Sequence, residues 1–121
     1  MRSGPRGSAC RYAAEPLQIR HYYLPISPTG DFTLTGGARF LPRDFLKLAQ
    51  LHLNGGSWNG RRVYSREWSE QATEPRYVMV PYKLRYGYLW WVIDYPYKDR
   101  TVRAYFASGN GGQVSMAIPM N

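Results

Sequence analysis

The sequence predicts an α+β fold in which helices precede and pack against an antiparallel sheet. Residues 42–56 place apolar side chains at three- and four-residue spacing, which is typical of an amphipathic helix. Near the C-terminus, three runs rich in β-branched and aromatic residues are predicted strands, at 86–95, 101–108 and 113–119. Their connections, "PYKD" and "GNGG", are short enough to make antiparallel hairpins.

Length and composition indicate one domain or a piece of one. The chain has 121 residues, of which 44% are hydrophobic and 16% aromatic, so it is not disordered as a whole. Residues 1–14 are rich in Arg, Gly, Ser and Ala and lack helix or strand periodicity. We therefore expect a disordered or displaced leader at 1–14 and an ordered region at 15–121.

The net charge of +8 makes an acidic partner such as nucleic acid an alternative to consider. Basic residues are scattered along the chain, and no basic run is longer than Arg61-Arg62. Basic residues do not alternate with aromatic ones as they do in single-strand binders. A solvated basic surface is therefore favoured, and a basic nucleic-acid-binding domain remains the alternative.

Several kinds of site and segment are not expected. Two distant histidines and the single Cys10 do not supply the three or four ligands that zinc needs, so no metal site is predicted. No helical pattern follows "GNGG", so no phosphate-binding loop or other cofactor site is expected. No apolar run reaches membrane-spanning length, and "MRSGPR" before "GSAC" lacks the apolar core of a signal peptide. The compartment stays open.

The predicted helix at 42–56 begins with Pro42, which suits the first helical position, and carries Asp44 in its first turn, where the helix dipole favours an anion. Gly55 is the expected stop. His52 lies on this helix with no second ligand at helical spacing, which predicts a packed or surface histidine. The predicted buried face consists of Phe45, Leu48, Ala49 and Leu53.

After a predicted turn at Asn59-Gly60, a short helix is expected to follow Ser65, whose hydroxyl can cap it. Residues 76–85 are predicted to be an irregular basic surface. Alternation along 86–95 predicts one face with Tyr86, Tyr88 and Trp90. Core packing is the favoured interpretation of these aromatics, and an aromatic-rich carbohydrate- or peptide-binding module is a second alternative function.

Three segments in order resemble the C-terminal part of the penicillin-recognising serine hydrolases. They are "GGARFLPRDFLKLAQLHLNGGSWNGRRVYSREWSEQATEP", "YGYLWW" and "YFASGNGGQVSMAIP". The resemblance covers residues 15–121 and is to the class C beta-lactamase-like branch, which includes esterases and nylon-oligomer hydrolases. It implies a partial beta-lactamase/transpeptidase-like fold. It also implies hydrolysis of ester or amide bonds, beta-lactams among them, through a serine acyl-enzyme.

The nucleophile of that family is not found in this chain. No serine begins an S-x-x-K motif, and no Y-x-N element is present. The S-x-N strings at Ser57 and Ser108 lie in predicted turns and are interpreted as coincidences. The chain is therefore predicted to be an inactive fragment whose partners are the missing N-terminal part of the fold or, through exposed sheet edges, other copies of itself.

The resemblance does assign a substrate-binding strand. The K-T-G equivalent falls on residues 107–109, and the backbone N–H of Asn110 then becomes one donor of the oxyanion hole. Ser108 and Gly109 would contact substrate, and Gly111 and Gly112 would allow the chain to turn away. Ala107 replaces the family's lysine, which favours an ester or amide hydrolase over a true beta-lactamase. The family is often periplasmic or secreted.

Overall fold

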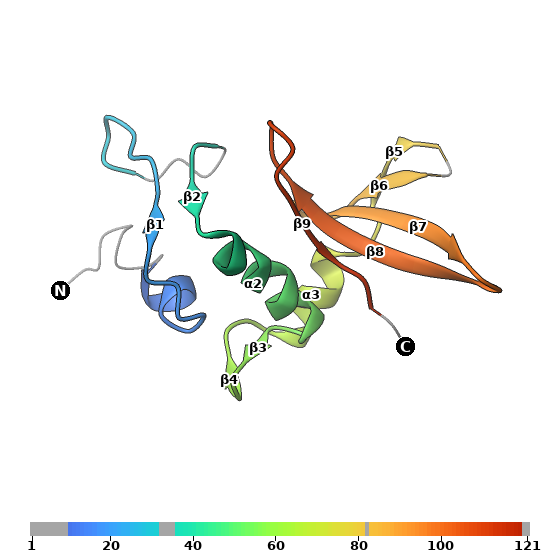
Figure 1. Ribbon diagram of the computed structural model, residues 1–121, viewed down its shortest axis with the longest axis horizontal. Coiled ribbons are helices and arrows are strands. Elements are labelled where there is room, and N and C mark those ends of the chain that lie inside the picture. The colour runs from blue at the N-terminus through green and yellow to red at the C-terminus, as the bar shows by residue number, and fades with distance from the viewer. Residues whose placement is uncertain (1–9, 32–35, 82, 120–121) are drawn as a thin grey trace. The chain divides into compact units, whose positions relative to one another are not determined.

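The computed structural model describes residues 10–31, 36–81 and 83–119 (Figure 1). It contains helices and antiparallel sheets, so the predicted α+β class is confirmed. The chain divides into two compact units between Lys47 and Leu48.

The first described element of the first unit is η1, a π-helix at Cys10–Ala14. The turn after η1 is closed by a hydrogen bond from the Ile19 amide to the Ala14 carbonyl, 2.8 Å long. Both of these side chains are buried together with Leu17, which is fully enclosed. The ammonium group of Lys47 donates to the Leu17 carbonyl at 2.9 Å. Burial of these small apolar groups is the reason that the segment is ordered.

A short antiparallel pair completes this unit. Strand β1, Tyr22–Tyr23, pairs with β2, Arg39–Phe40, and the rings of Tyr22 and Phe40 stack with centroids 6.2 Å apart. Such cross-strand aromatic pairs stabilise two-stranded ribbons that have few hydrogen bonds of their own.

Helix α2 occupies Pro42–Leu53, as the apolar spacing predicted, and its chain then turns through Gly55 and Gly56, both with positive φ. The predicted buried face is wrong at its end, because Leu53 is 41% exposed and His52 is buried. The apolar spacing did not decide whether His52 or Leu53 faces the interior in the last turn of the helix. In the structure, the imidazole of His52 faces the interior, where it packs against aromatic rings.

Strands β3, Ser57–Trp58, and β4, Arg61–Arg62, form a hairpin around the predicted Asn59-Gly60 turn. Both turn residues have positive φ, 48° and 75°, as a type I′ hairpin turn requires. Helix α3 follows at Arg66–Ala72, and the hydroxyl of Ser65 accepts a hydrogen bond from the Trp68 amide at 3.1 Å. The predicted turn and the predicted cap are both confirmed.

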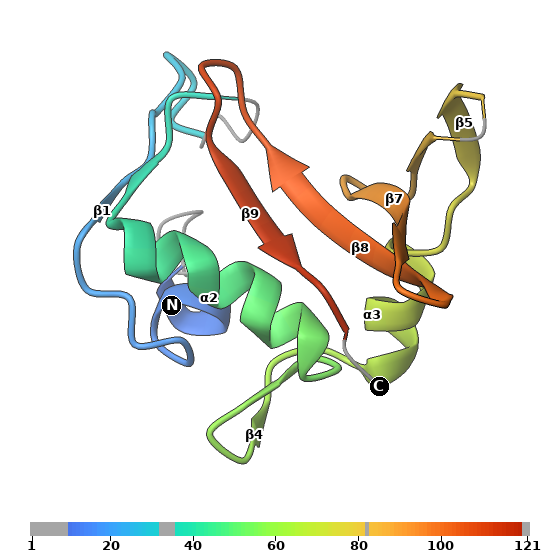
Figure 2. The ribbon, with the colours of Figure 1, turned by 45° about the vertical axis from the view of Figure 1, so that its right-hand side comes forward.

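The main sheet has five antiparallel strands in the order β5-β6-β7-β8-β9. Their bounds are Tyr77–Val80, Leu84–Tyr86, Trp91–Tyr97, Arg100–Ser108 and Val114–Ala117. Strands β8 and β9 run side by side in both ribbon views (Figures 1 and 2). The two predicted hairpins at the C-terminus are confirmed.

The irregular surface predicted at 76–85 is wrong, because β5 and β6 lie there. All four residues of β5 are exposed at the edge of the sheet, so burial imposes no alternating pattern on the sequence. Such an edge strand is recognised mainly by its hydrogen bonds to the neighbouring strand, and these cannot be read from the sequence.

The single strand predicted at 86–95 is also wrong. Strand β6 ends at Tyr86 and β7 begins at Trp91, with a turn between them that is closed by a hydrogen bond from the Gly87 amide to the Trp90 carbonyl, 2.8 Å long. Leu89 in this turn has a φ of 63°. The three aromatic side chains therefore do not share the face that alternation predicted, and Tyr86, Tyr88 and Trp90 each pack against a different ring.

The core of the second unit lies between α2 and the sheet. Ala49 of α2 packs with Val92 of β7, Tyr105 of β8 and Ala117 of β9, and Trp90 covers this cluster. Small side chains at positions 49 and 117 let the helix approach the strands closely. Within residues 10–31, 36–81 and 83–119, no helix has the length and apolar character needed to cross a membrane.

Gly87 fixes the turn between β6 and β7 against the end of α3. A Cβ at this position would lie 2.2 Å from the Ala72 carbonyl oxygen, and the Tyr88 amide donates to that same oxygen at 2.9 Å. A substituted side chain would displace the turn from the helix, because backbone cannot give way cheaply.

Gly87→Ala is therefore expected to lower the free energy of unfolding by about 1–3 kcal/mol, measured by urea denaturation. Gly36→Ala is the matched control, since a Cβ there meets no atom of the described residues within 4 Å and φ is not positive. The control should stay within about 0.5 kcal/mol of the parent. Equal effects of the two substitutions would contradict the close approach at Gly87.

Candidate functional site

The predicted substrate-binding residues lie together in the hairpin loop that joins β8 to β9. Ser108 is the last residue of β8 and pairs with Val114. The loop is closed by a hydrogen bond from the Gly109 amide to the Gln113 carbonyl, 2.9 Å long. Gly111 and Gly112 have φ values of 106° and 92°, which favour glycine, so the turn itself explains both residues. Every residue of this loop is exposed.

Asn110 occupies the tip of the loop. Among the residues that the structure describes, its backbone N–H has no hydrogen-bond acceptor, and neither has the hydroxyl of Ser108. An exposed amide at a tight turn is free to donate to a ligand. An exposed N–H at this position is what the oxyanion-hole role implied for Asn110 would need.

Gln113 is a residue of this loop that the sequence interpretation missed. Its carboxamide lies against two glycines: a Cβ at Gly109 would be 2.9 Å from Oε1, and one at Gly111 would be 3.3 Å from Nε2. The glycines therefore leave room for the Gln113 side chain to cover the loop. The sequence shows that Gln113 follows Gly109 and Gly111 closely. This spacing predicts a contact between them only when the conformation of the turn is known.

Two serines of the second unit are already used in the structure. Ser65 caps α3, and the Ser69 hydroxyl donates to the backbone carbonyl of His52 at 2.9 Å. The Ser69 hydroxyl is bonded to the main chain of His52, so this hydroxyl and the imidazole do not form a nucleophile and base pair.

The imidazole of His52 is 5% exposed and sits in an aromatic cluster with Tyr64, Trp90 and Tyr105. Its Nδ1 lies 2.6 Å from the Tyr64 hydroxyl oxygen, and its buried Nε2 has no side-chain hydrogen-bond partner among the described residues. Burial lowers the pKa of His52, although a hydrogen bond with the backbone of Ser69 acts in the opposite direction. Of the two predicted settings, packed or surface, the structure shows the packed one.

The tyrosines beside His52 are held neutral by the same surroundings. Burial raises the pKa of Tyr64, and it raises the pKa of Tyr105 to about 12. A tyrosine that acts as a base must lose its proton easily, and a raised pKa opposes this. Neither phenol is therefore suited to serve as the base beside a nucleophilic serine.

Asp94 is bound by two arginines on neighbouring strands. Arg103 donates from Nε to Oδ1 at 2.8 Å and from Nη2 to Oδ2 at 3.1 Å, and Arg85 also pairs with this carboxylate. The hydrogen bond from Arg103 is the main reason that the pKa of Asp94 is lowered, and Arg85 adds to it while burial opposes it. This carboxylate joins β6, β7 and β8 and is a structural ion pair.

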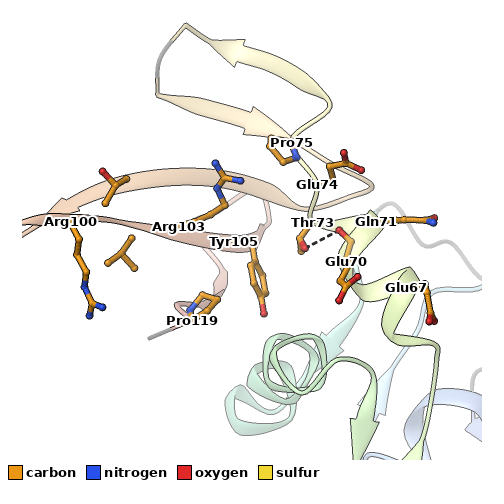
Figure 3. Close-up of a pocket in the computed structure, with 12 residues that line it drawn as sticks. Glu67, Glu70, Gln71, Thr73, Glu74, Pro75, Arg100, Arg103, Tyr105 and Pro119 are labelled. Carbon is orange, nitrogen blue, oxygen red and sulfur yellow. Dashed lines mark hydrogen bonds between the residues drawn. The ribbon is translucent and has the colours of Figure 1, made fainter. Parts of the chain in front are cut away.

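A cavity of about 900 Å³ lies between α3 and β8 (Figure 3). None of the residues from Ser108 to Gly112 lines it, so the structure separates the cavity from the predicted substrate-binding loop. In the part of the chain that the structure describes, no group of three His, Cys, Asp or Glu residues is placed to hold a metal ion.

Comparison of the chain with models of known protein families and with curated proteins finds no match in either case. The family resemblance therefore depends on the three sequence segments alone.

Because burial lowers the pKa of His52, the folded protein binds fewer protons at this site than the unfolded chain. The contribution to stability is complete above the ordinary pKa of 6.5 and is lost as the pH falls through 6.5 toward the lowered value. We expect the free energy of unfolding to fall below pH 6.5 by at most about 1.4 kcal/mol per pH unit. Asp94 acts in a separate window, below its ordinary pKa of 3.8.

The measurement is urea denaturation between pH 5 and 8. His52→Gln should remove this pH dependence, whereas His21→Gln, which removes the exposed second histidine, should leave it unchanged. The reverse pattern would show that His52 is not the group responsible.

Proposed function

We propose that this chain supplies the substrate-binding edge of a beta-lactamase-like serine hydrolase that cleaves ester or amide bonds through an acyl-enzyme. The supporting observation is the β8–β9 loop, where the Asn110 amide is exposed and has no acceptor among the described residues. The resemblance aligns this amide with a donor of the oxyanion hole.

In this proposal, the Asn110 N–H donates to the substrate carbonyl oxygen as negative charge develops there during serine attack. Fixed donors at this position stabilise the transition state more than the ground state. Gly109 lets the acyl group approach the backbone without a side chain between them. The hydroxyl of Ser108 is available to hydrogen-bond the substrate.

Ala107 directs the proposal toward esters and amides. Its side chain is apolar and half-buried on β8, so it offers no positive charge to the carboxylate of a beta-lactam. The nucleophilic serine and its base would come from another part of the fold. That part, carrying S-x-x-K, is the proposed partner, and association of copies through exposed edges such as β5 is the alternative.

A loop graft tests the oxyanion role directly. Residues 108–113 replace the equivalent turn of an active beta-lactamase-like esterase, and hydrolysis of p-nitrophenyl butyrate is followed. Asn110→Pro removes the N–H and is expected to lower kcat by about 10²–10³-fold with a smaller change in KM. Asn110→Ala keeps the N–H and should retain activity. Equal losses in both variants would assign the effect to the Asn110 side chain and not to its N–H.

The chain by itself should not react with a fluorophosphonate probe, because none of its serines begins an S-x-x-K motif. Intact-mass spectrometry after incubation should show unmodified protein, with an active serine esterase as the positive control. A stoichiometric adduct on any serine of the chain would overturn the proposal that the nucleophile comes from elsewhere.

A further inference from the structure

Three asparagines of this chain are followed directly by glycine, in the pairs Asn54-Gly55, Asn59-Gly60 and Asn110-Gly111. An asparagine in such a pair can lose its side-chain amide spontaneously, because the backbone nitrogen of the next residue attacks the carboxamide carbon. Glycine has no side chain to hinder this approach, and it leaves the backbone free to rotate. The sequence ranks the three pairs equally, so the local structure decides which of them can react.

The first pair is held by hydrogen bonds at the end of α2. The Gly55 amide, which would have to attack, donates to the His52 carbonyl at 3.0 Å. The Asn54 carboxamide oxygen accepts a hydrogen bond from Gln50 at 2.8 Å. The Gly55 carbonyl also accepts from Arg62 at 2.8 Å, which fixes the peptide on its other side. Reaction at this pair would therefore have to break several hydrogen bonds.

The second pair is restrained by its turn. Asn59 has a φ of 48°, in the left-handed region that a type I′ turn requires. This region has a ψ of about +47°, which directs the next peptide nitrogen nearly opposite to the side chain of the same residue. Strand pairing of Trp58 with Arg61 closes the turn. The nitrogen of Gly60 can therefore reach the Asn59 carboxamide only when the hairpin opens.

The third pair has neither restraint. Both Asn110 and Gly111 are exposed, and the Asn110 carboxamide and the Gly111 N–H have no hydrogen-bond partner among the described residues. Unlike Asn59, Asn110 does not have a positive φ. The bond across the turn, from the Gly112 amide to the Gly109 carbonyl, is 3.3 Å long. Figure 2 shows this loop as the free end of the β8–β9 hairpin, so its backbone can rotate while the strands stay paired.

We propose that Asn110 is a site of spontaneous deamidation in the folded protein. The Gly111 nitrogen loses its proton to solvent and bonds to Cγ of Asn110, the bond from Cγ to the side-chain nitrogen breaks, and ammonia leaves with a proton from solvent. One water molecule then opens the resulting five-membered imide at either carbonyl. The product is an aspartate or, where water breaks the ring bond to the main-chain carbonyl, an isoaspartate. Each product lowers the net charge of +8 by one.

The isoaspartate adds one methylene group to the backbone between residues 110 and 111 and leaves a carboxylate at the tip of the loop. The modification itself needs only water and does not depend on the proposed hydrolase function. One consequence does rest on that function: the new carboxylate would lie beside the carbonyl oxygen of the substrate and would repel the negative charge that develops there. Deamidation would then inactivate the substrate-binding loop with time.

The test is incubation of the full folded chain in mildly alkaline buffer, beside a sample unfolded in urea, followed by tryptic digestion and tandem mass spectrometry. Cleavage after Arg103 separates Asn110 from the other two asparagines, which share the peptide from Leu48 to Arg61. In the folded chain, Asn110 should be modified at least about tenfold faster than either of them, because they react only after local opening. In urea, the three rates should agree within about threefold.

Two variants assign the product to one residue. Asn110→Gln would have to close a less favourable six-membered ring, so it should reduce the acidic species seen by ion-exchange chromatography at least about tenfold. Asn54→Gln is the matched control and should leave that species unchanged. The proposal is overturned if Asn54 or Asn59 reacts as fast as Asn110 in the folded chain. It is also overturned if folding slows the reaction at Asn110 by about tenfold or more relative to urea.

Discussion

The packing of α2 against the sheet depends on one buried aromatic contact. The imidazole of His52 lies 4.7 Å from the Trp90 ring and 5.5 Å from the Tyr105 ring, measured between centroids. These three side chains come from a helix, a turn and a strand that are distant in the sequence. Since aromatic rings bury large areas, this cluster supplies much of the apolar burial of a core whose other members are small.

Other features of the second unit follow from this contact. The position of Trp90 requires the chain to turn between β6 and β7 instead of continuing as one strand, and the orientation of His52 exposes Leu53. The Ser69 hydroxyl holds the main chain of His52, which connects α3 to the same cluster. A polar side chain whose Nε2 has no side-chain hydrogen-bond partner among the described residues is thus enclosed by groups that have little freedom to move.

The local signals in the sequence predicted the elements that depend on local chemistry. Ser65 as a cap, Asn59-Gly60 as a turn, and the hairpin loop at Gly109–Gly112 all follow from the conformations that these residue types prefer. The residues predicted to bind substrate lie in one loop for the same reason. Gln113 was missed because its contact with the glycines exists only once the loop is folded.

The errors occurred where distant parts of the chain determine the outcome. Exposed β5 has no burial pattern, and Gly87 interrupts an apparently continuous strand because the Ala72 carbonyl needs its space. The cavity was not foreseen either, since the acidic side of α3 and the arginines of β8 are far apart in the sequence.

The close approach at Gly87 has a consequence for the cavity as well as for the fold. The amide of Tyr88 donates to the last carbonyl of α3, so the helix that lines one side of the cavity is anchored to the sheet just before Glu74. The distance between α3 and β8 across the cavity therefore depends on Gly87, which does not itself line the cavity.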